Sequence, residues 1–349
     1  MPSVTTTDRA RVRAEGELAP RWRTDVGDYV AAAEISRDGA LCILGAGDGR
    51  VHGLDLATGS PIFTIHAHAG GVLGVGISPD GERFITCGQE PSAKLWSRGG
   101  ELLRELPGGG ACWVEHVAWA PSGGRVATAA GRKVRLWTND GEPLVETEPL
   151  ESTVSALAWR ADGSGLAVAC YGGVHILPFV PGAKLRKLAW KGSLISLAWS
   201  PDAKIVACGS QDNSVHFWRL ATGRDSQMSG YSFKPKALAF DSESKLLATS
   251  GDRTVTVWDF RGKGPEGTRP IQLRSHKGVC TRLAFSPRRG VLASGSQDTS
   301  VLLWEPRRGT KPIRVASLED EITALHWHPQ DRGLLAADAS GNAAFWETS

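Results

Sequence analysis

The stretch Ser275–Pro306, SHKGVCTRLAFSPRRGVLASGSQDTSVLLWEP, decides the fold. It contains three short apolar runs, LAF, VLAS and VLLW, which end at Phe285, Ser294 and Trp304. Gly, Pro, Ser and Asp residues separate these runs, and this pattern is typical of consecutive β-strands joined by turns. A single unit of three strands cannot bury its own faces. We therefore expect the unit to be stable only if it recurs along the chain.

The unit does recur in the 349-residue chain, at intervals of about 40 residues. The position of Trp304 is filled in turn by Leu54, Trp96, Trp137, Leu177, Trp218, Trp258, Trp304 and Trp346. The position of Phe285 gives a second series, Ile35, Ile77, Trp119, Trp159, Trp199, Phe240, Phe285 and Trp327. Short strands at such a period indicate a propeller. Because both series have eight members, we predict an all-β, eight-bladed β-propeller of four-stranded antiparallel blades.

The two ends of the chain are predicted to close the ring together. Few residues follow Trp346, so the last blade lacks an outer strand of its own, whereas residues 18–26 have the length of a strand and no blade. We expect this N-terminal segment to pair with the last blade as its fourth strand. Pro20 is tolerable there because an outermost strand has one unpaired edge. We predict a flexible leader over residues 1–16 and a single propeller domain over residues 17–349.

Three of the repeats resemble those of a known family. LASGSQDTSVLLWEP (from Leu292), VACGSQDNSVHFWRL (from Val206) and LATSGDRTVTVWDF (from Leu247) resemble the second and third strands of WD40 repeats with the turn between them. Trp258-Asp259 is the WD pair itself. The resemblance covers roughly residues 18–349. It implies a rigid disc whose loops bind a protein or peptide partner.

Repeats of this family often contain a buried hydrogen-bond relay of a His, a Ser or Thr, an Asp and a Trp. The resemblance places this relay at His276, Ser294, Asp298 and Trp304, and in a second repeat at His68, Thr86 and Trp96. In that second repeat Glu90 stands in the place of the Asp, and Tyr231 and Trp190 replace the His in two others. A His-Ser-Asp set can also suggest a hydrolase. No nucleophile-elbow sequence surrounds Ser294, so we interpret the set as structural.

The family commonly binds partners on the face where the chain enters each innermost strand. Two positions of every blade are expected there: six residues before the Phe285 position, and one residue before the Asp298 position. The contact candidates at these positions are Trp113, Tyr29, Lys234, Gln211, Gln297 and Glu321. Trp113 follows a run of three glycines, and an exposed Trp has the chemistry of an interface hot spot.

Two other functions remain open at this point. The segment LDLATGSPIFTI, with Asp55, Thr58 and Gly59, faintly resembles the repeat turn of quinone-dependent dehydrogenases, which also use propellers. The pairs His66/His68 and His326/His328 have strand spacing that puts two imidazoles on one face, which leaves a metal-handling accessory protein as a further alternative. We favour a non-enzymatic scaffold with no catalytic residue, no metal and no cofactor.

Composition limits the partners and the compartment. The formal net charge of +3 at pH 7 is too small to argue for a nucleic-acid or membrane partner. The six cysteines show no zinc spacing and are expected to be free, mostly buried thiols, as in a reducing compartment. The polar N-terminus lacks the apolar core of a secretory signal. We expect a cytoplasmic, monomeric propeller.

Overall fold

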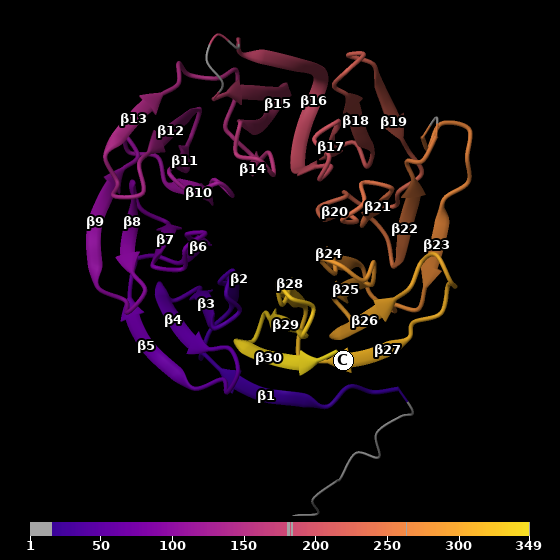
Figure 1. The fold of residues 1–349 in the computed structure, drawn as a ribbon, viewed down its shortest axis with the longest axis horizontal. Helices are drawn as coiled ribbons and strands as arrows, with labels where there is room; N and C mark the ends of the chain where they lie inside the picture. The colour runs from indigo at the N-terminus through magenta and orange to yellow at the C-terminus, as the bar shows by residue number, and fades with distance from the viewer. Residues whose placement is uncertain (1–15, 180–181, 183, 263, 349) are drawn as a thin grey trace, which may run out of the picture.

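A computed structural model of the protein describes residues 16–179, 182, 184–262 and 264–348. In this part of the chain thirty β-strands surround a central channel (Figure 1). The innermost strands around the channel are β2, β6, β10, β14, β16, β20, β24 and β28 (Figure 1). Across the same residues, no helix has the length and apolar character that crossing a membrane requires.

Six of the sheets have four antiparallel strands each, in the order given. Three of them come from the first part of the chain: β2 (Val30–Ile35), β3 (Leu41–Ala46), β4 (Arg50–Asp55) and β5 (Pro61–His66); β6 (Val72–Ile77), β7 (Arg83–Gly88), β8 (Ser92–Ser97) and β9 (Leu102–Pro107); β10 (Val114–Trp119), β11 (Val126–Ala130), β12 (Lys133–Trp137) and β13 (Pro143–Glu146). The others are β20 (Leu238–Phe240), β21 (Leu246–Thr249), β22 (Thr254–Asp259) and β23 (Ile271–Arg274); β24 (Cys280–Phe285), β25 (Leu292–Ser296), β26 (Ser300–Trp304) and β27 (Arg314–Ser317); and β28 (Ile322–Trp327), β29 (Gly333–Asp338) and β30 (Asn342–Glu347) with β1 (Pro20–Asp25).

The remaining sheet has six strands and corrects the predicted number of blades. Its order is β14 (Ala156–Trp159), β15 (Gly165–Pro178), β16 (Arg186–Trp199), β17 (Ile205–Ser210), β18 (Val215–Arg219) and β19 (Asp225–Met228). The described residues therefore form seven hydrogen-bonded sheets, that is, seven blades, and the prediction of eight four-stranded blades is wrong. Two sequence repeats, those of Leu177 and Trp218, lie within this one sheet, which we call the joined sheet.

Strand sharing is the physical reason for the difference. The first half of β15 pairs with β14, as at Ala169 with Ala156, and its second half pairs with β16, as at His175 with Lys187. In the same way, β16 pairs first with β15 and then, from Leu194, with β17. The chain thus passes from one repeat into the next without leaving a strand.

Two glycines let β15 change direction between its two halves. Gly172 and Gly173 have φ angles of 92° and 135°, a region that favours glycine, and the register shifts between Tyr171 and Gly173. A Cβ atom on Gly173 would lie 2.1 Å from the carbonyl oxygen of Leu188. Any larger residue there would push β15 away from β16.

The predicted closure of the ring is confirmed. Strand β1 pairs with β30 in antiparallel register, with Trp22 opposite Phe345 and Asp25 opposite Asn342. The Trp22 side chain is buried, and its Nε1 donates a 2.7 Å hydrogen bond to the carbonyl oxygen of Leu56, directly after β4 of the first sheet. The N-terminal strand therefore ties the last sheet to the first. Residues 1–15 of the predicted leader lie outside the described residues.

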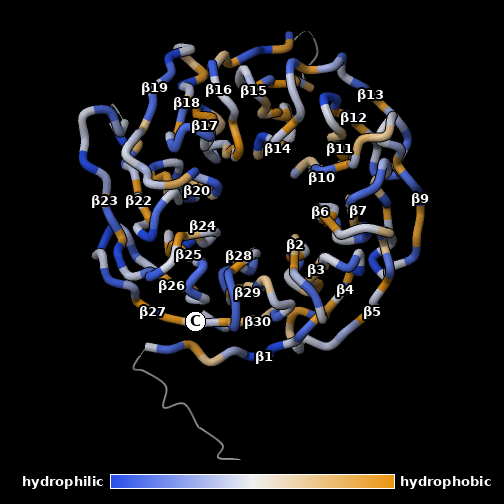
Figure 2. The backbone as a smooth tube through the Cα atoms, turned by 180° about the vertical axis from the view of Figure 1, so that it is seen from behind, coloured by the Kyte–Doolittle hydropathy of each residue, from blue (hydrophilic) through white to orange (hydrophobic). Residues whose placement is uncertain are grey.

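The hydrophobic core is divided into clusters, most of them between neighbouring sheets and one between the two halves of the joined sheet. Figure 2 shows apolar stretches in strands around the whole ring, with many of the hydrophilic residues in the connecting segments. Trp304 and Trp346, which occupy the repeated Trp position, are fully buried. Because each sheet is covered on both faces, the second strands such as β3, β17 and β29 are buried along their whole length.

Candidate partner-binding site at the mouth of the channel

The relay residues of the β24–β27 sheet form a continuous buried network. His276 Nε2 lies 2.7 Å from Ser294 Oγ, and Trp304 Nε1 donates to the same hydroxyl at 2.8 Å. His276 Nδ1 contacts Ser300 Oγ at 2.8 Å and lies 3.5 Å from Asp298 Oδ1. Asp298 accepts from the hydroxyl of Ser300, so Ser300 bridges the imidazole and the carboxylate. The sequence pattern did not identify this bridging role.

Asp298 also holds the loop that leads into β24. The backbone N–H groups of Lys277 and Gly278 donate to Oδ2 of Asp298, and that of Ser300 donates to Oδ1. These hydrogen bonds, with the Ser300 hydroxyl, favour the carboxylate and keep the pKa of Asp298 well below its usual range, although its partial burial acts in the opposite direction. The carboxylate is therefore a structural anchor.

A second network surrounds His68. Its Nε2 lies 2.7 Å from Thr86 Oγ1, to which Trp96 Nε1 donates at 2.9 Å. On the other side of the ring, Nδ1 lies 2.5 Å from Oε1 of Glu90, and Lys94 Nζ is 3.0 Å from the same oxygen. Glu90 thus supplies the carboxylate that the resemblance places on an Asp.

Two other sheets replace parts of the relay with different residues. Tyr231 takes the place of the His: its hydroxyl lies 2.8 Å from Thr249 Oγ1 and accepts from Trp258 Nε1 at 2.8 Å. In the last sheet the fully buried Asp338 accepts from the backbone N–H groups of Glu319 and Asp320. The position that aligns with Asp298 in this repeat is Ser340, two residues after Asp338, so the alignment missed Asp338.

A cavity of about 580 Å³ opens at the mouth of the channel, and four of the six contact candidates line it. These are Tyr29, Lys234, Gln297 and Glu321. They come from the loops before β2, β20 and β28 and from the turn between β25 and β26. The two candidate positions per repeat therefore converge on one part of the mouth.

The other two candidates lie outside this cavity lining. Gln211 is adjacent, because its Oε1 accepts a 3.4 Å hydrogen bond from Lys234 Nζ. Trp113 is 48% exposed and precedes β10, which lies across the channel opening from β24 (Figure 1). The structure therefore brings five of the six candidates together and leaves Trp113 apart.

Sequence reasoning missed several residues of the cavity, among them Phe233, Lys236 and Arg282. Phe233 is 51% exposed, an unusual state for a large aromatic residue. Arg282 is the one charged residue of the innermost strand β24, at a register shift between Cys280 and Arg282. A charged residue in an innermost strand was the signal that would have identified it.

The cavity has an excess of positive charge. Lys234, Lys236 and Arg282 line it with a single carboxylate, that of Glu321, which accepts a hydrogen bond from Gln297 Nε2 at 3.3 Å. Burial lowers the pKa of Arg282, while Tyr29 and Glu321 act in the opposite direction. A guanidinium in such surroundings interacts more strongly with an anionic ligand than one in bulk water does.

The residues that suggested a dehydrogenase or a metal-handling protein can be compared with their surroundings in the structure. Asp55 Oδ1 accepts from both the backbone N–H and the hydroxyl of Thr58 at 2.8 Å, so the LDLATG segment is a turn held by its own side chain. Neither His66/His68 nor His326/His328 belongs to a group of three metal-ligating side chains within the described ranges. His326 lies on β28, and burial lowers its pKa to about 4.

Antiparallel sheets arranged around a channel, with loops converging on its mouth, define a β-propeller with a candidate binding face. The family model for "WD domain, G-beta repeat" matches residues 59–97, 100–138, 182–219, 226–259 and 267–305, which is more than half of the chain. The chain belongs to the WD40-repeat family. Membership of this family supports a protein-interaction scaffold as the general class.

Three curated relatives share part of this sequence. The chain is 27% identical to WD repeat-containing protein slp1 of Schizosaccharomyces pombe (strain 972 / ATCC 24843) over 64% of its own length and 47% of the relative's. It is 24% identical to telomerase protein component 1 of Rattus norvegicus over 96% of this chain and 12% of that protein. It is 26% identical to the ribosome biogenesis protein WDR12 homolog of Chlamydomonas reinhardtii over 82% and 66%. The chain thus spans less than two thirds of each relative.

Among solved structures, the chain is similar to the crystal structure of the computationally designed Ika8 protein. The TM-score is 0.79 with 21% sequence identity, and the match covers 96% of this chain and 100% of that one. At this identity the likeness supports the propeller fold alone.

Proposed function

We propose that the protein is a non-enzymatic scaffold that binds a partner through an extended peptide with an acidic side chain, at the mouth of the channel. The observation that carries this proposal is the gathering of Lys234, Lys236 and Arg282 around one cavity between the exposed rings of Tyr29 and Phe233. The two rings offer apolar surface to a peptide, while the three cations select its charge.

Arg282 is the group best suited to fix the acidic side chain. Its Nη1 donates to the carbonyl oxygen of Thr281 at 2.9 Å, which holds the guanidinium in place. A planar guanidinium can offer two parallel donors to a carboxylate. Lys234 and Lys236 are exposed at the rim and would attract the peptide over a longer range.

The relay geometry supports a scaffold rather than a hydrolase. Ser294 is fully buried, and its hydroxyl is shared by His276 and Trp304. A nucleophile must reach a substrate carbonyl, and this oxygen has no exposed surface from which to do so. We propose further that the protein acts in the cytoplasm as a monomer and needs no cofactor to bind its partner. Its small net charge is in keeping with binding neither nucleic acid nor membranes.

A synthetic peptide array tests this proposal. Full-length protein is applied to peptides that carry Asp or Glu at one position, and to matched peptides with Gln, Ser or Lys there. We expect enrichment of the acidic peptides, and weaker binding as salt rises. Affinities of the best peptides are then measured by fluorescence anisotropy.

Two variants make the test specific to the cavity. Lys234→Ala combined with Lys236→Ala should weaken binding about tenfold, because each lost charge contact is worth roughly 0.7 kcal/mol. Lys204→Ala is the matched control: Lys204 is an exposed lysine outside the cavity lining, paired with Asp202 at 3.3 Å. No preference for acidic peptides, or equal losses in the two variants, would overturn the proposal.

A further inference from the structure

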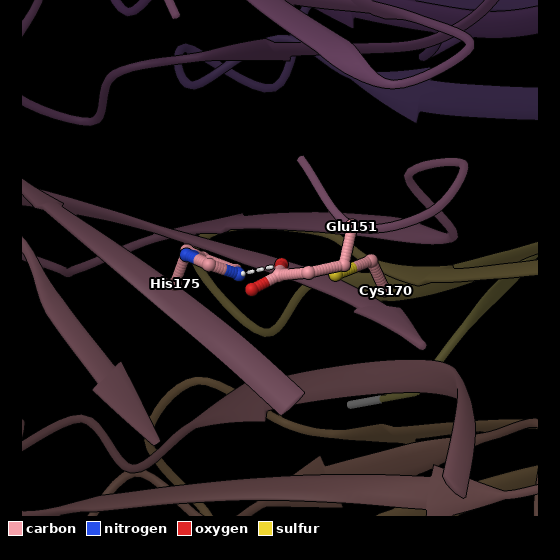
Figure 3. A group of neighbouring side chains, drawn as sticks. All are labelled: Glu151, Cys170 and His175. Carbon is pink, nitrogen blue, oxygen red and sulfur yellow. Dashed lines mark hydrogen bonds and ion pairs between the residues drawn. The ribbon is translucent and has the colours of Figure 1, made fainter. Parts of the chain in front are cut away.

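Three side chains of metal-ligating type meet at the joined sheet, outside the cavity at the channel mouth. Glu151, Cys170 and His175 each offer one ligand atom, and these atoms all lie within 4.8 Å of one another (Figure 3). Throughout the described ranges no other group of three His, Cys, Asp or Glu side chains is gathered in this way. None of the three residues lines the cavity at the mouth of the channel.

The bend in β15 brings two of these residues together. Cys170 and His175 lie on either side of Gly172–Gly173, where the strand changes its pairing partner from β14 to β16. Glu151 comes from the segment between β13 and β14. Because the three residues come from two separate segments, only the folded sheet assembles the group.

The present contacts already orient the three ligand atoms. His175 Nε2 lies 2.8 Å from Oε2 of Glu151, and Lys187 Nζ binds the other carboxylate oxygen. His175 Nδ1 is buried without a hydrogen-bond partner in the described residues, so the Nε2 side alone orients the ring through a polar contact. Cys170 is fully buried, and its Sγ lies 3.2 Å from the carbonyl oxygen of Tyr171.

We propose that Glu151, Cys170 and His175 form a binding site for a divalent cation of the zinc class. One thiolate, one imidazole and one carboxylate are a zinc ligand set, and three protein ligands leave the fourth tetrahedral position to water. The sulfur and nitrogen ligands disfavour Mg²⁺ and Ca²⁺, which prefer oxygen. Tetrahedral zinc bonds of about 2.0–2.3 Å place ligand atoms roughly 3.3–3.7 Å apart, so His175 Nε2 and Glu151 Oε2, now 2.8 Å apart, must separate by about 0.5 Å.

Binding changes the bonds of the group in a balanced way. The thiol of Cys170 loses its proton to solvent as the metal–sulfur bond forms, and the metal replaces the hydrogen bond between His175 Nε2 and Glu151 Oε2. The neutral imidazole keeps one proton, which moves to Nδ1. Lys187 retains its contact with the other oxygen of Glu151 and so positions the carboxylate as a one-oxygen ligand.

An ion can reach this group from solvent. Glu151 and His175 line a cavity of about 490 Å³ together with Arg132, Leu177 and Leu185. The Glu151 side chain is 45% exposed, whereas that of His175 is only 6% exposed. Glu151 therefore lies at the entrance, and His175 lies deeper in the cavity.

Cobalt titration of the full-length protein, after treatment with a chelator, tests the site directly. Co²⁺ substitutes for Zn²⁺ and gives a thiolate-to-cobalt charge-transfer absorption only when a cysteine sulfur binds it. We expect this absorption to saturate at one equivalent and to disappear when Zn²⁺ is added. Cys170→Ser should abolish it. Cys208→Ser is the matched control, because Cys208 is another fully buried, free cysteine of the same sheet, and it should leave the absorption unchanged.

A second variant covers the possibility that Cys170→Ser fails to fold. Glu151→Gln changes an exposed residue and should weaken cobalt affinity by about 10–100-fold. No charge-transfer absorption in the wild-type protein overturns the proposal. So does an absorption that persists in folded Cys170→Ser, that is lost equally in Cys208→Ser, or that Glu151→Gln leaves at wild-type affinity. Peptide binding at the channel mouth is measured separately, so failure of either proposal can be recognised without the other.

Discussion

The β24–β27 sheet and the second half of the joined sheet place different residues at the same positions of the repeat. Where the first has His276, Ser294 and Trp304, the second has Trp190, Cys208 and Trp218. In the first, an imidazole and an indole share one buried hydroxyl. In the second, the rings of Trp190 and His216 stack with their centroids 3.8 Å apart.

The difference shows that the relay is one of two ways to fill the same space. The β24–β27 sheet pairs its buried polar atoms with one another, which also fixes the loop before β24 through Asp298. The joined sheet relies on aromatic packing and leaves Trp190 Nε1 and His216 Nδ1 buried without partners among the described residues. It gains backbone pairing instead, because β15 and β16 continue from one repeat into the next.

Removal of the largest relay side chain should have the largest effect on stability. Trp304 is fully buried, so Trp304→Ala is expected to lower the free energy of unfolding by about 3–5 kcal/mol. Trp190→Ala, in a partly exposed residue of the joined sheet, should cost less than half of that. Urea unfolding followed by circular dichroism compares the two variants. Equal losses would mean that the stacked pair is as important as the relay.

Loss of the shared hydroxyl should give the next largest difference in stability between the two sheets. Ser294→Ala leaves His276 Nε2 and Trp304 Nε1 without their partner, and we expect a loss of about 1–3 kcal/mol. At the equivalent position of the joined sheet, Cys208→Ala removes only packing, worth about 1 kcal/mol. The same urea titration measures both. A larger loss in Cys208→Ala would contradict the proposed division between polar and apolar filling.

The relay should also make stability depend on pH. Burial lowers the pKa of His276 in the folded protein, against the opposing effect of Asp298. The unfolded chain therefore takes up the proton first as the pH falls below about 6.5, and the folded state loses at most about 1.4 kcal/mol between pH 7.5 and 5.5. His276→Gln should reduce this dependence, whereas the same change at exposed His66 should not. Melting temperatures at the two pH values provide the check, and an unchanged dependence in His276→Gln would refute the assignment.

The smallest effect is expected at Trp113. Because its side chain is 48% exposed, Trp113→Ala should change the free energy of unfolding by no more than about 0.5 kcal/mol. Its melting curve can be compared with that of Trp304→Ala. A drop of several kcal/mol would show that Trp113 packs as a core residue rather than standing free on the binding face.

Local sequence patterns were enough to predict the strands, the ring and its closure. Each repeat has its own apolar runs and turns, and the segment that pairs with β30 had no other blade to join. The number of blades could not be predicted in this way. Whether two repeats form two sheets or one depends on how Gly172 and Gly173 turn β15 and on the continuity of β16 through Lys191, and the repeat spacing does not record either feature.

Part of the candidate site could be predicted because some of its residues occupy fixed positions of the repeat. Positions counted from the repeat located Tyr29, Lys234, Gln297 and Glu321 at one cavity. Arg282 was not predicted because it lies within a strand, next to a register shift, rather than at a loop position. The sequence did not predict the group of Glu151, Cys170 and His175, because its members have no regular spacing and only the joined sheet brings them together.

Charge reversal at the channel mouth tests the central claim most directly. The double variant Lys234→Glu with Lys236→Glu is compared with the wild-type protein by anisotropy, with one acidic peptide from the array and its Lys-substituted counterpart. The account predicts that the wild type prefers the acidic peptide and that the variant loses or inverts this preference. The same preference for the acidic peptide in both proteins would contradict it.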